Sequence, residues 1–360
     1  MFVYWLILFF FGSAAILNRR SEVGFSGSST PRWNLPWLIL WILLTFIIGL
    51  RHEVGGDWNS YLWHLNAMRG KTLADALFER DPAYAFLEWF GANAWGGIYL
   101  VNTVCAGIFS WCLLVFCRTQ SRPWLALCIS TPILIIVVSM GYTRQAVAIG
   151  LVMVGFIQLQ RGQVWRFILL TACASLFHTS ALIFATLAIF FLSNTKVVRL
   201  IGLFVTAGVF FTLMLQDYLA LLYHDYIVAE YHSAGAVFRV AMTALPAILF
   251  LIFREKFSLT VLQKKFWTLM AILALSCIIL FAALPSSTAV DRFALYLVPL
   301  QIFVFSNMPD AIQKSNTGKY LLVSVAVAYS AAIQFVWLSF GAHASEWLPY
   351  RLYPLEWLRD

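Results

Sequence analysis

The stretch "LPWLILWILLTFIIGL" at positions 35–50 is followed directly by "RHEVGGDWNSYLWHL" at 51–65. The first part carries no charge and is nearly long enough to cross a bilayer as a helix. The second part places Arg51, His52, Glu53 and Asp57 within seven residues, although only 11% of the chain is charged. Because polar groups at membrane depth are costly and tend to be functional, this junction indicates a polar site at one membrane surface.

The composition of the whole chain points to the same class of protein. The chain has 360 residues, of which 62% are hydrophobic, and its mean hydropathy is +0.82. Lipid offers no hydrogen-bond partners to the backbone, so its apolar runs must be helices. We therefore predict an all-α polytopic integral membrane protein, a single domain over 1–360 with about twelve transmembrane segments. The predicted segments are 2–17, 35–50, 98–117, 124–139, 146–160, 166–177, 179–192, 200–215, 240–253, 266–284, 293–308 and 320–340.

The basic residues collect in alternate loops, which the positive-inside rule places in the cytoplasm. Topology thus accounts for the net charge of +8, and no nucleic-acid partner is needed. Both termini then lie outside. This assignment requires 166–192 to cross twice, because a single crossing would turn the lysines at 264 and 265 outward. The basic residues are Arg19, Arg20, Arg32, Arg118, Arg122, Arg161, Arg166, Lys196, Arg199, Arg254, Lys256, Lys264, Lys265, Lys314 and Lys319.

Two long segments face outward in this topology. They are a large loop at 51–97 and a second loop at 216–239 that contains an amphipathic helix. All six histidines and most of the acidic residues map to the outer side. Function is therefore expected outside, and cytosolic ATP is not the expected substrate. The six cysteines form no CxxC pair, and neither a disulfide framework nor a metal site is predicted.

Three arginines stand where predicted spans enter the membrane from outside. Arg144, Arg239 and Arg292 each lie near a helix start, where the helix dipole makes a cation unfavourable by itself. Together with the helix ends they are suited to hold one anion. Arg51 reaches the same surface from the end of its helix. The alternative is that each arginine extends to lipid headgroups.

Two residues are candidates for proton transfer. His178 lies between two apolar runs, and an imidazole is suited to proton transfer near neutral pH, although a hydrogen-bonded structural role is the alternative. Asp57 follows a glycine pair whose tight turn is expected to bring it back toward Arg51, either as a base or as a brace for an arginine. Trp58 and Tyr61 begin an aromatic segment suited to sugar faces or to the membrane interface.

Five short motifs, in order, resemble those of the EpsG/Wzy-type polysaccharide polymerases. The resemblance covers about 45 to 300. It includes an arginine–glycine–aspartate–tyrosine signature, an acidic-aromatic stretch, an arginine–glutamine helix start, and later histidine and arginine segments. The corresponding stretches are "RHEVGGDWNSY" at 51–61, "RDPAYAFLEWF" at 80–90, "YTRQAVAIGL" at 142–151, "FHTSAL" at 177–182 and "DRFALYLVP" at 291–299.

The resemblance implies a fold like that of the GT-C glycosyltransferases and a reaction on the periplasmic face of the bacterial inner membrane. A glycan on undecaprenyl pyrophosphate would be transferred to a lipid-linked repeat unit, as in O-antigen or exopolysaccharide synthesis. The implied partners are this lipid-linked glycan, membrane lipid and a chain-length-regulating co-polymerase. No cofactor is expected, and arginines are expected in place of a metal.

The site residues follow from the motifs and from the charge pattern. We predict that Arg51, Arg144, Arg292, His178 and Asp57 are catalytic. The predicted substrate-binding residues are Arg239, His52, Tyr61, Trp58, Gln145, Asp291 and Tyr142. Three alternatives stay open: a transporter or flippase for an anionic lipid-linked glycan, an O-antigen ligase that uses the same donor, and a non-catalytic membrane scaffold.

Overall fold

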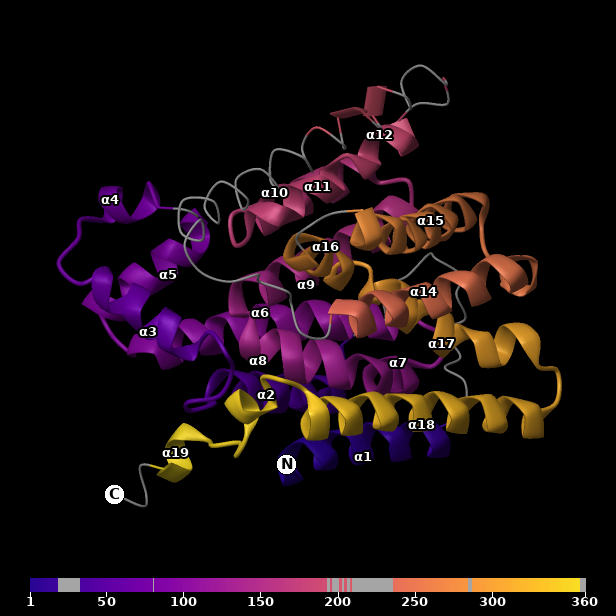
Figure 1. Ribbon diagram of the computed structural model, residues 1–360, viewed down its shortest axis with the longest axis horizontal. Helices are drawn as coiled ribbons and strands as arrows, with labels where there is room; N and C mark the ends of the chain where they lie inside the picture. The colour runs from indigo at the N-terminus through magenta and orange to yellow at the C-terminus, as the bar shows by residue number, and fades with distance from the viewer. Residues whose placement is uncertain are drawn as a thin grey trace.

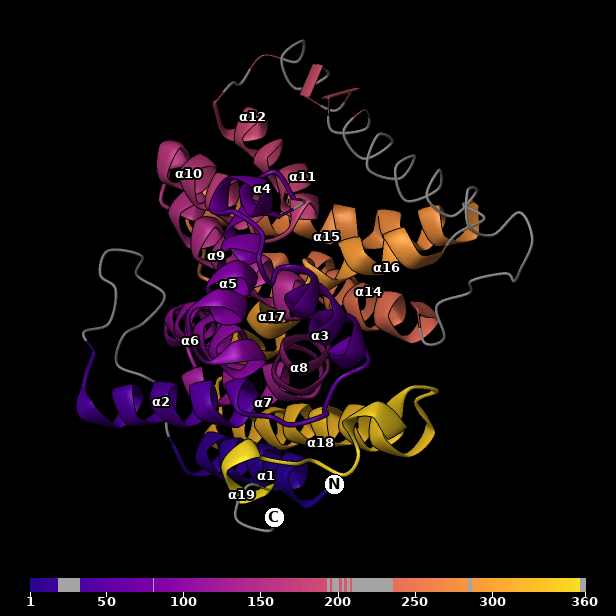
Figure 2. The ribbon, with the colours of Figure 1, turned by 90° about the vertical axis from the view of Figure 1, so that its left-hand side faces the viewer.

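A computed structural model describes residues 1–18, 33–79, 81–192, 236–283 and 287–356, with isolated positions 195, 201, 202, 204, 205 and 208. Within these residues the regular structure is helical, apart from one β-bridge between Arg51 and Leu352. Long helices lie side by side, and the short helices α3, α4 and α5 gather at one end (Figures 1 and 2). Most of the predicted span 200–215, and the outer-loop residues 216–235, lie outside the described residues.

The apolar runs form the long helices that the sequence predicts. Among the described residues, five helical stretches are long and apolar enough to cross a membrane, and several shorter apolar helices accompany them. The chain is therefore a multi-pass membrane protein. The five are α6 (Gly97–Arg118), the continuous α7–η1–α8 helix (Pro123–Gly141), α15 (Val261–Ala283), α16 (Ser287–Leu295) with α17 (Val298–Ile312), and α18 (Asn316–Phe340). The others are α1 (Phe2–Leu17), α2 (Leu35–Gly49), α9 (Thr143–Gln160), α10 (Val164–Ser175), the segment η2–α11–α12 (Thr179–Leu192) and α14 (Ala236–Phe253).

The α7–η1–α8 helix is the centre of the bundle. Of its most apolar stretch, 94% is buried, against 28% for α18, so other helices surround it. Its middle is a π-helical segment, η1 (Thr131–Val138). Pro132 has no N–H to donate one turn back, and a wider turn accommodates this loss. The hydroxyls of Ser130 and Thr131 both donate to the Leu127 carbonyl at 2.8 Å, which stabilises the irregular turn.

The two halves of 166–192 run in opposite directions, as the charge pattern predicts. The helix α10 ends beside α5, where the Leu176 carbonyl accepts a hydrogen bond from Ala83 at 2.9 Å. The following segment, η2–α11–α12, packs back along α10. It ends beside α15, where Lys265 donates to the Phe190 carbonyl at 2.5 Å. The pair is thus a broken helical hairpin.

The end of the bundle that carries α3 (Trp58–Ala67), α4 (Leu73–Leu77) and α5 (Pro82–Asn93) is here called the α3–α5 end. The C-terminal segment, with η4 (Ala344–Trp347) and α19 (Tyr353–Glu356), covers the same end beside α2 (Figure 2). His52 donates its N–H to the Arg351 carbonyl at 3.0 Å, and Tyr353 donates to the Leu50 carbonyl at 2.8 Å. This pairing fixes the backbone on both sides of Arg51.

Candidate functional site

Asp81 connects three segments at the α3–α5 end. It precedes α5, has a left-handed backbone with φ 62°, and is 3% exposed. Its Oδ1 accepts hydrogen bonds from the backbone N–H and the hydroxyl of Thr179, both at 3.1 Å. Its Oδ2 accepts one from Nη1 of Arg144 at 3.3 Å and lies 3.9 Å from Nδ1 of His178. The carboxylate therefore joins α5 to the start of α9 and to the break after α10.

The guanidinium of Arg144 lies over two tyrosine rings. Its Cζ is 5.8 Å from the centre of the Tyr61 ring and 5.5 Å from that of Tyr84. Cation–π attraction and the bond to Asp81 together fix its direction. The Arg144 side chain is 31% exposed, so it remains accessible while it is held.

Arg239 and Asp291, two further predicted site residues, form an ion pair. Arg239 on α14 donates through Nε and Nη2 to the two carboxylate oxygens of Asp291 on α16, with the second contact at 2.7 Å. This bidentate geometry is the most specific that an arginine and a carboxylate form. Gln145 on α9 donates to the carbonyl of Arg292 at 2.8 Å. Arg292 lies in the last turn of the short helix α16 and not at a helix start as predicted, so this bond joins the start of α9 to the end of α16. The side chain of Arg292 itself is exposed.

The charges of these arginines act on two neighbouring titratable groups, Asp57 and Tyr142. Burial raises the pKa of Asp57, while the positive charges of Arg144 and Arg292 and a hydrogen bond from Tyr61 lower it. Burial also raises the pKa of Tyr142, on which the charges of Arg239, Asp57, Asp291 and Arg292 all act. The charges of Arg144 on α9 and Arg292 on α16 thus act on Asp57, and those of Arg239 on α14 and Arg292 act on Tyr142. We call Arg144, Arg239 and Arg292 the arginine cluster.

Arg51 lies at the predicted end of the bundle but is buried, where the sequence predicts that it reaches the outer surface. It is 1% exposed, and its guanidinium donates to the carbonyls of Val54 at 3.1 Å and Ile48 at 2.8 Å. It also donates to Asn102 Oδ1 at 3.4 Å and to the hydroxyl of Thr143 at 2.8 Å. These neutral acceptors occupy the donors that a pyrophosphate would need. The positive charges that act on Asp57 are those of Arg144 and Arg292.

The predicted aromatic surface is mostly interior. Trp58 and Tyr61 are 6% and 3% exposed and pack with α5 and α6. His52 lies beside them, with Nδ1 2.5 Å from the Tyr99 hydroxyl, and the Tyr99 ring stacks on Tyr353 at 3.8 Å. The structure therefore buries Trp58 and Tyr61 within the α3–α5 end, with the Tyr61 ring beneath the guanidinium of Arg144. A run of aromatic residues in a sequence does not show whether the rings lie on the protein surface or in its core, because the segment that carries them folds into helices.

Glu88 is a residue that sequence reasoning missed. It is 4% exposed on α5, and its Oε1 has no hydrogen-bond partner among the described residues. Burial raises its pKa to about 7, with Arg144 acting against that rise and the charges of Asp81 and Glu79 adding to it. Asp81 stands immediately before α5 and Glu88 lies within it, so the sequence already placed two acids close together in the acidic-aromatic stretch at 80–90.

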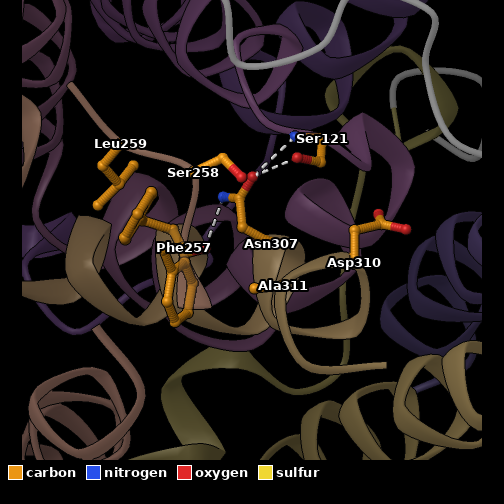
Figure 3. A pocket seen from close by; sticks show the side chains of 8 residues that line it. Ser121, Phe257, Ser258, Leu259, Asn307, Asp310 and Ala311 are labelled. Carbon is orange, nitrogen blue, oxygen red and sulfur yellow. Dashed lines mark hydrogen bonds between the residues drawn. The ribbon is translucent and has the colours of Figure 1, made fainter. Parts of the chain in front are cut away.

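Among the described residues, no group of three or more histidine, cysteine or acidic side chains could hold a metal ion. The opposite end of the bundle has a small pocket of about 50 Å³, which is room for only a few waters. Figure 3 shows Asn307 joined to Ser121 there, and the Asn307 Oδ1 accepts from the Ser121 N–H at 3.0 Å. Beside it, Arg122 donates through Nε and Nη2 to Asp310 at 2.9 and 3.1 Å. These contacts lock the helix ends and leave no space for a glycan.

The α3–α5 end is thus the candidate site, and comparison with known proteins identifies its family. A model of the EpsG family matches residues 34–352, a range that includes every predicted site residue. No curated protein and no solved structure matches the chain. The chain therefore belongs to the EpsG family, as its motifs predict.

Proposed function

We propose that the protein is a bacterial polysaccharide polymerase that transfers a growing glycan from undecaprenyl pyrophosphate to a lipid-linked repeat unit. Family membership and the apolar helices make it a polysaccharide-polymerase-like membrane protein. The proposal adds the donor, the acceptor and a site on the periplasmic face of the inner membrane. It also retains about twelve spans and a GT-C-like fold, as the motifs and the apolar runs predict.

The observation that carries the proposal is the meeting of the arginine cluster at one end of the bundle. Glycosyl transfer from a pyrophosphate donor places growing negative charge on the leaving group. Positioned cations stabilise that charge most when they need not reorganise during the reaction. Asp81 and Asp291 hold Arg144 and Arg239 in fixed directions, which supplies that preorganisation. Arg292 is the exposed member of the cluster and is suited to first contact with the donor.

The acceptor hydroxyl must lose a proton, and we assign that proton to Asp57. The acceptor oxygen attacks the anomeric carbon, the bond from that carbon to the pyrophosphate oxygen breaks, and the leaving group keeps the electron pair. Asp57 is partly exposed and lies within the field of Arg144 and Arg292. The side chain of His178 is 16% exposed and faces Asp81, which favours a bracing role. Arg51, Gln145, Trp58 and Tyr61 act by positioning the cluster.

The proposal is tested by replacing each member of the arginine cluster with alanine. R144A, R239A and R292A should each lower the polymerisation rate by about 100-fold or more. The measurement is the ladder of surface glycan on a gel, in a host whose own polymerase is deleted. Arg69→Ala is the control, because Arg69 is an exposed arginine at the same end. Normal ladders from all three cluster variants would refute the site.

A purified protein distinguishes the alternatives. We expect it to lengthen lipid-linked repeat units in detergent without any nucleotide sugar. Movement of the lipid across a vesicle membrane without lengthening would identify a transporter. Capping of a lipid A core would identify a ligase. The chain-length-regulating co-polymerase stays a prediction from the family resemblance.

A further inference from the structure

A second cavity lies at the end of the bundle opposite the arginine cluster. Its volume is about 400 Å³, and it opens where α12 (Leu187–Leu192), η3 (Arg254–Lys256) and the start of α15 come together. This volume is in the range of small-molecule sites. The cavity contributes nothing to the proposed transfer reaction, since its lining comes from α12, η3 and α15 and includes neither Asp57 nor a member of the arginine cluster.

The polar side of this cavity carries more positive than negative charge. Its lining includes Arg254, Lys264 and Lys265 but one acid, Glu255. Glu255 contacts both Lys264 and Arg254, the latter at 3.3 Å from its Nε. The single carboxylate of Glu255 is shared between two cations. The residues that line the cavity therefore keep a net positive charge. Glu255 is 69% exposed, so solvent weakens its hold on both partners.

Lys265 is held in place at the inner side of the cavity. Its ammonium donates to the Phe190 carbonyl at the end of α12 and lies 5.0 Å from the centre of the Phe191 ring. These contacts direct the ammonium group of Lys265 toward the junction of α12 and α15. A flexible surface lysine would have no such fixed direction. The cavity therefore has at least one cation whose position is fixed by its contacts with the protein.

The other side of the cavity is apolar. Leu269 and Ile272 follow the lysines along α15 by one and two turns, and Thr268 adds a hydroxyl. Ile272 is 51% exposed, so this wall continues onto the surface of a helix that is itself apolar enough to span the membrane. Cations at the helix end, with an apolar wall leading away along the span, match a molecule that has an anionic head and a hydrocarbon tail.

We propose that this cavity binds an anionic phospholipid, with its phosphate at Arg254, Lys264 and Lys265 and its acyl chain along Leu269 and Ile272. Basic recesses between spanning helices at the membrane surface recognise such headgroups. A free anion would use the cations alone and leave the apolar wall in water. The site is independent of the proposed function, so a failed polymerase assay would leave it unaffected.

The test is native mass spectrometry of the full-length protein in detergent, titrated with phosphatidylglycerol and, separately, with phosphatidylcholine. Phosphatidylglycerol should be retained preferentially. The double variant K264A/K265A should weaken its binding by about 30-fold. Glu255→Gln should strengthen binding, because it releases Lys264 and Arg254; this exposed position can change without affecting the fold. Lys256→Ala is the matched control, since Lys256 lies on the short helix η3 together with Arg254 and Glu255 but does not line the cavity.

Three results would overturn the proposal. The first is equal retention of the two lipids, and the second is a loss with K256A as large as that with K264A/K265A. The third is binding of glycerol 3-phosphate, which has no acyl chains, as tight as that of the lipid; that result would identify a simple phosphate site. If the double variant unfolds, as judged by its melting temperature, the response to Glu255→Gln decides, and no gain in affinity would count against the proposal.

Discussion

Glu88 is a buried acid whose charge depends on its surroundings. Its carboxyl lies on α5, is 4% exposed and has a pKa of about 7 because burial disfavours the charged form. In the unfolded chain the same group has its ordinary pKa of 4.5. The folded state thus binds a proton more tightly than the unfolded state does. Ionisation of Glu88 in the folded protein therefore works against folding.

This difference predicts a pH-dependent stability. Below about pH 4.5 Glu88 is protonated in both the folded and the unfolded state, so it does not make the free energy of unfolding depend on pH. As the pH rises from 4.5 to about 7, only the unfolded state ionises, so stability is lost over that window and the loss is complete above it. The full loss is about 3 kcal/mol. Glu88→Gln should remove it, so the variant should melt higher than the parent protein at pH 8.

The measurement is thermal unfolding in detergent between pH 4.5 and 8. Asp75→Asn is the control, because Asp75 is an exposed acid on α4 whose charge is not among those that act on Glu88. Parallel melting curves for the parent and Glu88→Gln across the whole range would show that Glu88 stays ionised in the folded protein.

Arg51 shows most clearly that a sequence can mark a residue as important without revealing its role. Sequence predicts that it is important, because an arginine at the end of an apolar run needs a partner. Sequence does not say whether the partner is a ligand or the chain itself. The partners are Val54 and Ile48, which are near in sequence, and Thr143, which is 92 positions away. That long-range contact depends on how α2 and α9 pack, and periodicity carries no information about it.

At the scale of elements, the connection from α2 to α3 has one position that only glycine fits. Gly55 has φ 106°, and a Cβ there would lie 2.1 Å from the Met140 carbonyl oxygen at the end of α8. Its N–H also donates to the Glu346 carbonyl at 2.8 Å. The loop that carries Asp57 is thus pressed against both the central helix and the C-terminal segment.

Gly55→Ala should therefore destabilise the protein by more than about 2 kcal/mol and also lower activity, since Asp57 moves with the loop. Gly70→Ala is the matched control. Gly70 has φ 75°, but a Cβ there meets nothing within 4 Å, so only backbone strain remains, about 1 kcal/mol. Equal melting temperatures for the two variants would show that contact with Met140 does not matter.

The helices themselves were predictable because lipid leaves the backbone few alternatives. Each predicted apolar run within the described residues coincides largely with a helix, including the broken pair at 166–192. The short helices α3 to α5 were predicted only as an outer loop. Their polar composition gives a weak signal, and their helicity depends on packing: α3 and α5 pack against α6, and α4 packs against α5.

At the scale of the whole molecule, Trp347 joins distant parts of the chain. It is 1% exposed, its indole donates to the Ile136 carbonyl at 3.0 Å, and its own carbonyl accepts from the Tyr4 hydroxyl at 2.8 Å. One residue thus connects α1, through its backbone carbonyl, and the central helix, through its indole, to the segment that covers Arg51. Such a connection could not be predicted from sequence, because nothing local marks it.

Trp347→Ala should cost about 3–5 kcal/mol, because it leaves a cavity among three elements and an unpaired carbonyl at Ile136. Trp63→Ala removes the same side chain from an exposed position, 68% accessible, and should change stability by less than about 0.5 kcal/mol. Thermal unfolding of the two variants in detergent measures the difference. A similar small change in both would mean that the C-terminal segment is only loosely attached.

The covering of Arg51 by the C-terminal segment also orders the protein's biogenesis. Trp347 is translated 211 positions after Ile136 and 343 positions after Tyr4. While the ribosome is still making the later helices, the backbone of Leu50 and His52 lacks its hydrogen-bond partners, and the neighbourhood of Arg51 stays open. A nascent chain can insert its spans one after another, but this end of the bundle closes only when residues 347–353 emerge. Stalled or prematurely released chains would therefore expose an unfinished backbone edge there, which gives membrane proteases a local mark of incompleteness.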